Sequence, residues 1–213
     1  MKVVEIFNSI EGEGKRAGLP ATFIRLFGCN LRCSYCDSMY AVEGNGFTEM
    51  SIDDILKKVE EFDCPNITLT GGEPLIHPDV VSLLDRLCEK HYWINIETNG
   101  SIAVPYRPVD GSLFYTFDYK TASSNMQHRM NERAFEELKP FDVIKFVVGN
   151  DEDLEQALEI GKKYPKPYIY LSPVFGSIDP KQLVEFILKN RLWNWRVQLQ
   201  LHKFIFDPNA RGV

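Results

Sequence analysis

The feature of this sequence that most restricts its fold is a repeated alternation of short apolar runs with helical patterns. Most runs are continuously apolar instead of alternating with polar residues, which is typical of parallel strands buried on both faces of a sheet. The seven runs cover residues 21–27, 66–70, 92–97, 113–117, 143–148, 168–171 and 196–201.

Four stretches between these runs repeat apolar residues at the spacing of one helix face, within residues 52–62, 80–88, 154–161 and 183–188. Ser51 and Asp54 form a capping box before the first of them. The crossover from residue 97 to 113 contains Pro105, Pro108 and Gly111 and predicts no full helix. Strand–helix alternation predicts an α/β fold with a parallel sheet or barrel. Because a complete eight-unit barrel needs about 250 residues, we expect a shortened, incomplete (β/α) barrel of about six parallel core strands.

No repeat, low-complexity tract or long linker divides the 213 residues, so we expect a single domain over 1–213, with a cysteine-bearing loop at 28–50 and a C-terminal extension from about 191 to 213. The net charge of −6 argues against a nucleic-acid partner and favours a small-molecule substrate. Without a signal peptide or an apolar run of membrane-spanning length, a cytoplasmic location and no membrane partner are expected.

Unusual sequences follow four consecutive predicted strands, where the sites of parallel α/β folds form. They are residues 28–36 (G-C-N-L-R-C-S-Y-C), 71–74 (G-G-E-P), 98–100 (T-N-G) and 118–120 (D-Y-K). Since the carboxyl ends of parallel strands lie at one edge of a sheet, these segments should converge on one mouth.

Three of the five cysteines, Cys29, Cys33 and Cys36, lie within eight residues at C-x3-C-x2-C spacing. A structural zinc site needs a fourth ligand, and none is obvious nearby. Three thiolates with an open fourth position suit a catalytic [4Fe-4S] cluster, although a non-catalytic zinc-binding module is an alternative. Cys64 and Cys88 are isolated, and we expect both to be buried packing residues.

Tyr35 precedes the third cysteine, and the resulting C-x3-C-x-aromatic-C pattern is similar to that of the radical S-adenosylmethionine (radical SAM) superfamily. The superfamily also carries a G-G-E-P motif beside the methionine end of SAM. The resemblance therefore implies that Gly72 and Glu73 bind the cofactor, with glycine allowing a close approach of the backbone.

Four further segments resemble the 7-carboxy-7-deazaguanine synthase family: S-I-E-G-E-G at 9–14, F-I-R-L at 23–26, Asp37-Ser38, and Q-L-H-K at 200–203. The resemblance runs from residue 3 to about 205. It implies a ring contraction of 6-carboxy-5,6,7,8-tetrahydropterin to 7-carboxy-7-deazaguanine with loss of ammonia, a lyase-type step towards 7-deazapurines such as the queuosine precursor. The implied cofactors are a [4Fe-4S] cluster, SAM and Mg2+. The implied partners are an external electron donor such as flavodoxin and a second copy in a homodimer.

The same resemblance implies roles for individual residues. Substrate binding falls to Ile10, Glu11, Gly12, Arg25 and Thr70. Cofactor binding falls to Gly72, Glu73, Thr98, Asp118, Tyr119 and Lys120, the last three matching the family's S-P-K segment only at the lysine. The cluster ligands are Cys29, Cys33 and Cys36, and Ser38 supplies a hydroxyl to Mg2+.

Glu97, at the end of the third strand, and His202, in the region of the last predicted strand, are the candidate groups for proton transfer. A second enzyme hypothesis is a glycyl-radical-activating enzyme, which shares the three-cysteine motif. Arg25, the S-I-E-G-E-G segment and the lack of cysteine groups for extra clusters argue against it.

Overall fold

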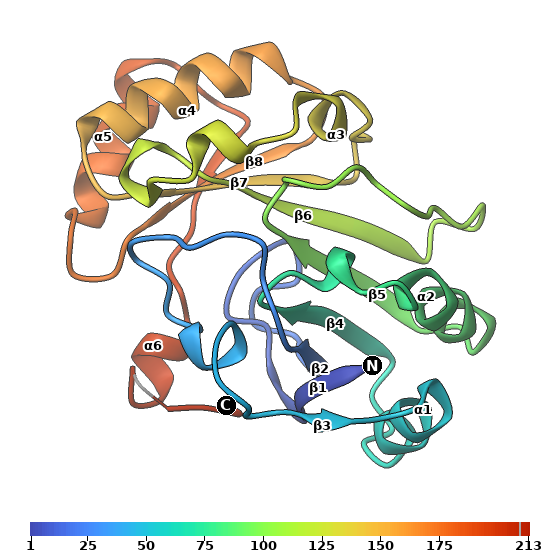
Figure 1. The fold of residues 1–213 in the computed structure, drawn as a ribbon. Coiled ribbons are helices and arrows are strands. Elements are labelled where there is room, and N and C mark those ends of the chain that lie inside the picture. Colours follow the sequence, from blue (N-terminus) through green and yellow to red (C-terminus); the bar gives the residue numbers. More distant parts are fainter. Residues whose placement is uncertain (209) are drawn as a thin grey trace.

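The computed structural model describes residues 1–208 and 210–213, which form a nine-stranded sheet in the order β3-β1-β2-β4-β5-β6-β7-β8-β9. All neighbours from β2 to β9 pair in parallel, whereas β1 is antiparallel to both β2 and β3. β3 and β9 are the two edges, so the sheet curves without closing into a barrel (Figure 1).

The strands are β1 (Lys2–Ile10), β2 (Pro20–Leu26), β3 (Thr48–Glu49), β4 (Asn66–Gly71), β5 (Trp93–Thr98), β6 (Leu113–Tyr119), β7 (Val143–Val148), β8 (Tyr168–Pro173) and β9 (Trp195–Val197). The helices are α1 (Ile52–Glu60), α2 (Val80–Glu89), α3 (Glu132–Glu136), α4 (Asp151–Lys163), α5 (Pro180–Lys189) and α6 (His202–Ile205).

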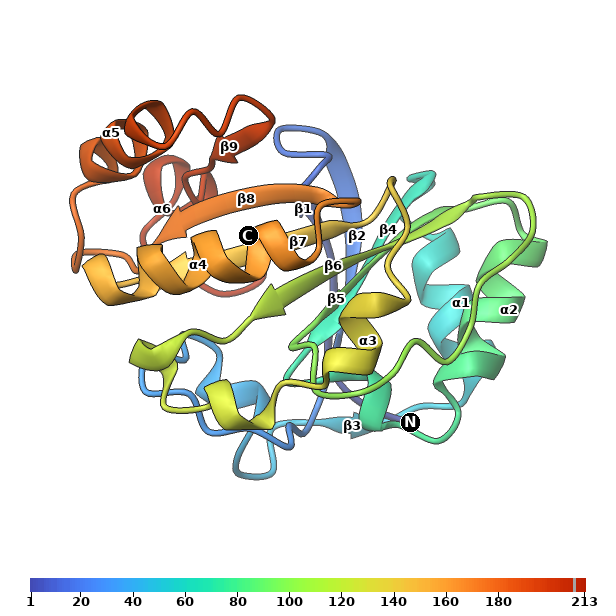
Figure 2. The ribbon, with the colours of Figure 1, turned by 90° about the horizontal axis from the view of Figure 1, so that it is seen from above.

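The main hydrophobic core lies between the outer face of the sheet and helices α1 to α5, which surround it in Figure 2. Alternate strand residues such as Ile24, Leu69 and Ile96 are fully buried there against helix residues such as Leu84. Each such side chain stabilises the fold by about 1.5–3 kcal/mol. The predicted capping box of Ser51 and Asp54 is present at the start of α1.

The inner face of the parallel strands is polar, and many of its side chains are buried. It carries Thr68 and Thr70 on β4, Asn95 and Glu97 on β5, Thr116 and Asp118 on β6, Lys145 on β7 and Ser172 on β8. Polar groups that are buried together must satisfy one another or a ligand. The hollow side of the sheet, here called the lumen, is therefore built to hold polar groups.

All seven predicted strands are present, and the prediction of an incomplete parallel barrel is confirmed. The antiparallel strands β1 and β3 and the short helix α3 were not predicted. The last strand was placed wrongly: β9 covers only Trp195–Val197, and the chain then turns into α6, whose first residue is His202.

After β9 the chain crosses back towards β1. The Leu201 amide donates to the Gly12 carbonyl at 2.9 Å, and the side chain of Gln198 exchanges two hydrogen bonds with the backbone of Gly14. Farther on, the guanidinium of Arg211 stacks on the ring of Tyr40 at 4.0 Å. The chain after β9, here called the C-terminal segment, thus spans the open side of the sheet.

No helix in the described part of the chain is long and apolar enough to span a membrane.

Candidate active site

The cysteine loop begins at the carboxyl end of β2 and extends across the mouth of the curved sheet. Ser34 donates through its amide to the Ser124 carbonyl at 3.1 Å and through its hydroxyl to the Ser123 carbonyl, both beyond β6. The Tyr35 hydroxyl donates to the Val147 carbonyl of β7 at 3.4 Å. The loop is therefore fixed to strand ends on the far side of the mouth.

Cys29, Cys33 and Cys36 are free and half-buried on this loop. Burial raises the pKa of the Cys33 thiol to about 11 and also raises that of Cys36. Two N–H groups point at the sulfur of Cys29, from the Leu31 amide at 3.4 Å and from the Asn99 side chain at 3.6 Å. Such donors stabilise thiolates, so this donor set fits an iron–sulfur cluster.

Among residues 1–208 and 210–213, no three His, Cys, Asp or Glu side chains come close enough together to hold one metal ion. Thiolates around a zinc ion must converge on a single tetrahedral centre, whereas in a [4Fe-4S] cluster each thiolate binds a different iron. Cys64 and Cys88 are buried, as predicted for packing residues.

The G-G-E-P segment at the end of β4 packs directly on the cysteine loop. A Cβ atom on Gly72 would lie 2.2 Å from the Gly28 carbonyl oxygen and 2.9 Å from the Cys29 Cβ, so only glycine fits. The Glu73 side chain is fully buried and accepts from the amides of Leu75 and Asn99 and the hydroxyl of Thr98, at 3.0, 2.7 and 2.9 Å. Its carboxyl group connects the ends of β4 and β5.

This close contact gives a first prediction. Gly72→Ala should push the G-G-E-P segment away from the cysteine loop, lower the free energy of unfolding by about 1–3 kcal/mol and reduce the iron bound after anaerobic reconstitution. The control is Gly46→Ala in the cysteine loop, because a Cβ on Gly46 would meet nothing nearer than 3.9 Å. Iron analysis and denaturant unfolding measure both effects, and equal iron content in the two variants would contradict the prediction.

Buried charges lie in the lumen below the mouth. Lys145 binds Glu13 at 2.6 Å and Asp118 at 3.5 Å, and Asp118 also pairs with Lys120 at 3.0 Å. Glu13 Oε1 and Asp118 Oδ1 are buried without a hydrogen-bond partner in the described part of the chain. Unpaired buried acceptors are costly, so these two oxygens are suited to donors from a bound molecule.

The residues of D-Y-K point in different directions because a strand alternates its faces. The side chain of Asp118 faces the lumen, whereas that of Tyr119 packs among Phe135 and Phe146 in the outer core. The ring of Tyr119 therefore points away from the mouth, and its predicted contact with a cofactor would come from its backbone. Lys120 lies 5.8 Å from the ring centre of Tyr35, on the cysteine loop.

The β1–β2 loop fills the floor of the lumen. Glu11 is 1% exposed, and its Oε1 accepts from Arg16 at 2.7 Å and from the Thr68 hydroxyl. Arg16, 2% exposed, also donates to the Trp93 and Ile67 carbonyls at 2.6 and 2.8 Å. Burial and the nearby Glu97 charge raise the pKa of Glu11 to about 7. Its side chain is thus part of the floor.

The other predicted substrate residues surround this floor. Ile10 ends β1, and the Thr70 hydroxyl donates to Glu97 at 2.9 Å. An added Cβ on Gly12 would lie 2.1 Å from the His202 ring. His202 is therefore held against Gly12 from α6, and burial lowers its pKa.

Arg25 and Ser38 are partnered within the chain. Glu5 accepts from Arg25 Nε at 2.7 Å, and the two side chains are 17% and 22% exposed. The terminal guanidinium nitrogens of Arg25 have no hydrogen bond within the described residues.

The Ser38 hydroxyl donates to Asp37 at 2.9 Å, which leaves its oxygen able to accept or to coordinate a cation.

Sequence reasoning missed Arg16, Glu13, Lys145 and Asn99. Lys145 interrupts the apolar run of β7 much as Arg25 interrupts that of β2, so the same signal could have found it. Arg16 lies in a loop and carries no such signal. Asn99 belongs to the T-N-G segment, which was placed at the mouth without a role for its amide.

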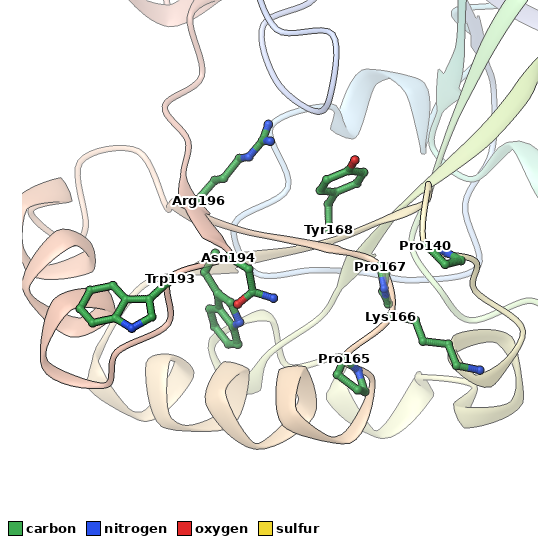
Figure 3. A pocket seen from close by; sticks show the side chains of 9 residues that line it. Pro140, Pro165, Lys166, Pro167, Tyr168, Trp193, Asn194 and Arg196 are labelled. Atoms are coloured by element: carbon green, nitrogen blue, oxygen red, sulfur yellow. The ribbon is translucent and has the colours of Figure 1, made fainter.

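A separate cavity of about 370 Å³ lies at the amino ends of β8 and β9, away from the cysteine loop (Figure 3). It is lined by Pro140, Pro165, Lys166, Pro167, Tyr168, Trp193, Asn194, Trp195 and Arg196. None of these is a predicted site residue.

This chain is similar to known proteins in both fold and sequence. The crystal structure of QueE from Escherichia coli superposes with a TM-score of 0.79 and 26% identity over 93% of each chain. SuiB of Streptococcus suis, at 14% identity over 83% of this chain and 48% of its own, shares the fold with a TM-score of 0.57. The 7-carboxy-7-deazaguanine synthase of Clostridium acetobutylicum is 42% identical, covering 100% of this chain and 99% of that protein. That of Chlorobaculum tepidum is 40% identical, covering 100% and 97%.

The family model described as the radical SAM superfamily matches residues 23–106, which contain the three cysteines and the G-G-E-P segment. With the incomplete barrel and the loop across its mouth, this match defines a radical SAM enzyme, a class that uses a [4Fe-4S] cluster and SAM. Full-length similarity narrows the class further. The chain belongs to the 7-carboxy-7-deazaguanine synthase family.

Proposed function

We propose that this chain converts 6-carboxy-5,6,7,8-tetrahydropterin to 7-carboxy-7-deazaguanine with loss of ammonia. The observation that carries the proposal is the position of the cysteine loop, which lies across the mouth of a lumen lined by buried charged side chains. A bicyclic substrate with many N–H groups and a carboxylate matches such a lining. The proposal agrees with the family to which the chain belongs.

The three cysteines would hold the cluster, and Gly72, which packs against Cys29, and Thr98 would bind SAM. When bound, the cluster and SAM together supply the radical that removes a hydrogen atom from the substrate. The buried oxygens of Asp118 and Glu13 that lack partners are acceptors for hydroxyl or N–H groups of the bound molecules. The protein's part is to orient these molecules and to keep water away from them.

Arg25 and Glu97 would bind opposite kinds of groups on the substrate. Glu5 uses only the Nε of Arg25, so the other two guanidinium nitrogens can bind the substrate carboxylate as a fork. Glu97 is held by Thr70 and is suited to accept from the N–H groups of the pterin or to move a proton during the rearrangement. His202, with its lowered pKa, is neutral and able to accept a proton at neutral pH.

Ser38 is our proposed protein ligand for Mg2+. Its oxygen and the adjacent Asp37 carboxylate are hard donors of the kind that Mg2+ prefers. Mg2+ commonly keeps several water or substrate ligands and needs few from the protein. Loss of Mg2+ dependence in Ser38→Ala would support this assignment.

The reaction is tested directly by incubating reconstituted protein anaerobically with reductant, SAM, Mg2+ and 6-carboxytetrahydropterin. Mass spectrometry should find 7-carboxy-7-deazaguanine and 5'-deoxyadenosine together. Recovery of unchanged pterin alongside cleaved SAM would reject the substrate and retain the radical chemistry. A glycyl-radical-activating enzyme would give that second result.

Replacing Arg25 with alanine should raise the substrate KM and lower kcat/KM by about 10–100-fold, because charge-assisted hydrogen bonds to the carboxylate are lost. Iron content should not change. Arg25→Lys should recover only part of the loss, since an ammonium cannot form the fork. Arg86→Ala, which removes an exposed arginine paired with Asp53 at 3.0 Å, is the control. Loss of the cluster in Arg25→Ala would instead identify Arg25 as structural.

For partners, we propose an external electron donor such as flavodoxin and a homodimer. The exposed apolar side chains of Val184, Leu188 and Trp193, at 45%, 57% and 73%, offer a surface for a second copy. Light scattering of Leu188→Asp and the parent protein would test the dimer, which the variant should weaken.

A further inference from the structure

Asn99 lies at the contact between the T-N-G segment and the cysteine loop, and the reaction outlined above leaves it without a role. Its side chain is buried, at 7% exposed. The amide nitrogen donates to the Cys29 sulfur at 3.6 Å and to the Asn30 side-chain oxygen at 3.0 Å. A nitrogen-to-sulfur distance of this size is that of a hydrogen bond to a large, polarisable acceptor.

The orientation of the Asn99 amide is determined by its neighbours. Its oxygen accepts from the Ser101 backbone amide at 3.0 Å, which can only donate. In keeping with this orientation, the Asn30 oxygen accepts from the Asn99 nitrogen at 3.0 Å, and the Asn30 nitrogen donates to the Ser101 hydroxyl at 2.8 Å. The NH2 group of Asn99 must therefore be the end that faces the sulfur.

The backbone of Asn99 is fixed as well. Its amide donates to Glu73 Oε2 at 2.7 Å, and the other oxygen of Glu73 is held by Thr98 and by the Leu75 amide. Both oxygens of this fully buried carboxyl are thus used within the protein. Glu73 therefore holds the Asn99 backbone in place.

We infer that Asn99 is a positioning residue that sets the reduction potential of the cluster through its hydrogen bond to Cys29. This inference rests on the proposed role of Cys29 as a cluster ligand. Reduction adds negative charge to the cluster and its thiolates, and an N–H dipole aimed at the sulfur stabilises the more negative state. Loss of the donor therefore makes the cluster harder to reduce.

The test is an EPR-monitored redox titration of the reconstituted cluster in the parent protein, Asn99→Leu and Asn30→Ala. Asn99→Leu keeps the side-chain volume and removes the donor. At a fixed potential, its ratio of reduced to oxidised cluster should fall about tenfold, the equilibrium effect of about 1.4 kcal/mol, equivalent to a potential about 59 mV lower. Asn30→Ala removes the other acceptor of Asn99, keeps the bond to sulfur, and should titrate like the parent.

The possible results separate the inference from the proposed function. Equal potentials in Asn99→Leu and the parent, with full iron content in both, overturn the role of Asn99 alone. If the parent protein assembles no [4Fe-4S] cluster, the proposed cluster site fails first. A variant that loses stability or iron while its remaining clusters titrate normally would show that Asn99 is merely structural. Asn99→Asp places a carboxylate against the thiolate and should lower the reduction potential further. This variant replaces Asn99→Leu in the test if Asn99→Leu binds too little cluster to titrate.

Discussion

Replacing Cys33 with alanine is expected to abolish SAM cleavage and product formation together. Two thiolates cannot hold a [4Fe-4S] cluster that relies on three, so iron bound after anaerobic reconstitution should fall from about four per chain to near zero. Cys33 is half-buried, and burial raises the pKa of its thiol to about 11, so binding iron must displace its proton. Iron analysis, absorption spectra and 5'-deoxyadenosine yield measure the effect.

Cys64→Ala is the matched control. Cys64 is 7% exposed and lies outside the cysteine loop, with its sulfur 3.6 Å from the Pro20 carbonyl. Its loss should cost packing energy and leave both iron content and SAM cleavage intact. A Cys33→Ala variant that still bound four irons and cleaved SAM would refute the assignment of the triad.

The parallel sheet was predictable because its signal is local. Strands buried on both faces are continuously apolar, and six of the seven runs form strands over most of their length. The seventh run contributes only its first two residues to β9. The three cysteines were equally accessible, since their spacing places them on one loop wherever the rest of the chain lies. β1 was missed because it is an antiparallel strand near the edge, with only Val3 buried among its nine residues.

The environment of a side chain was harder to predict than its position along the chain. Glu73 and Tyr119 lie at the mouth as expected, yet the carboxyl of Glu73 is used by the T-N-G segment and the ring of Tyr119 is in the outer core. His202 faces Gly12 from a helix instead of a strand. Each depends on contacts between segments far apart in the sequence, which a local pattern does not contain.

The lumen shows the same dependence on distant segments. Glu13 from the β1–β2 loop meets Lys145 from β7, 132 residues away, and the Arg16 side chain bonds to the carbonyls of Trp93 and Ile67. A barrel that lacks strands leaves its interior open to water. In this chain the β1–β2 loop closes the floor and the C-terminal segment spans the side, so that Glu13, Asp118 and Lys145 are only 10–20% exposed.

The second large effect is expected at Arg16 in this floor. Arg16→Ala leaves Glu11 buried without its cation and frees two carbonyls, so the free energy of unfolding should fall by about 3–5 kcal/mol. At about 2–4 °C per kcal/mol for a chain of this size, the melting temperature should drop by roughly 6–20 °C. Arg86→Ala breaks an exposed ion pair, whose partners are 46% and 79% exposed. This control should cost no more than about 1 kcal/mol.

The pH dependence of the stability lost in Arg16→Ala distinguishes an unpaired buried charge on Glu11 from lost packing. Burial and Glu97 already raise the pKa of Glu11 from its ordinary value of 4.5 to about 7, and Arg16 opposes the rise. Without Arg16 the folded-state pKa rises further, so the folded protein retains a proton that the unfolded chain releases. Arg16→Ala should therefore lose more stability at pH 8 than at pH 5, and adding Glu11→Gln should remove this difference. Denaturant unfolding at both pH values measures it, and a loss independent of pH would mean that Arg16 acts through packing and hydrogen bonds to the backbone alone.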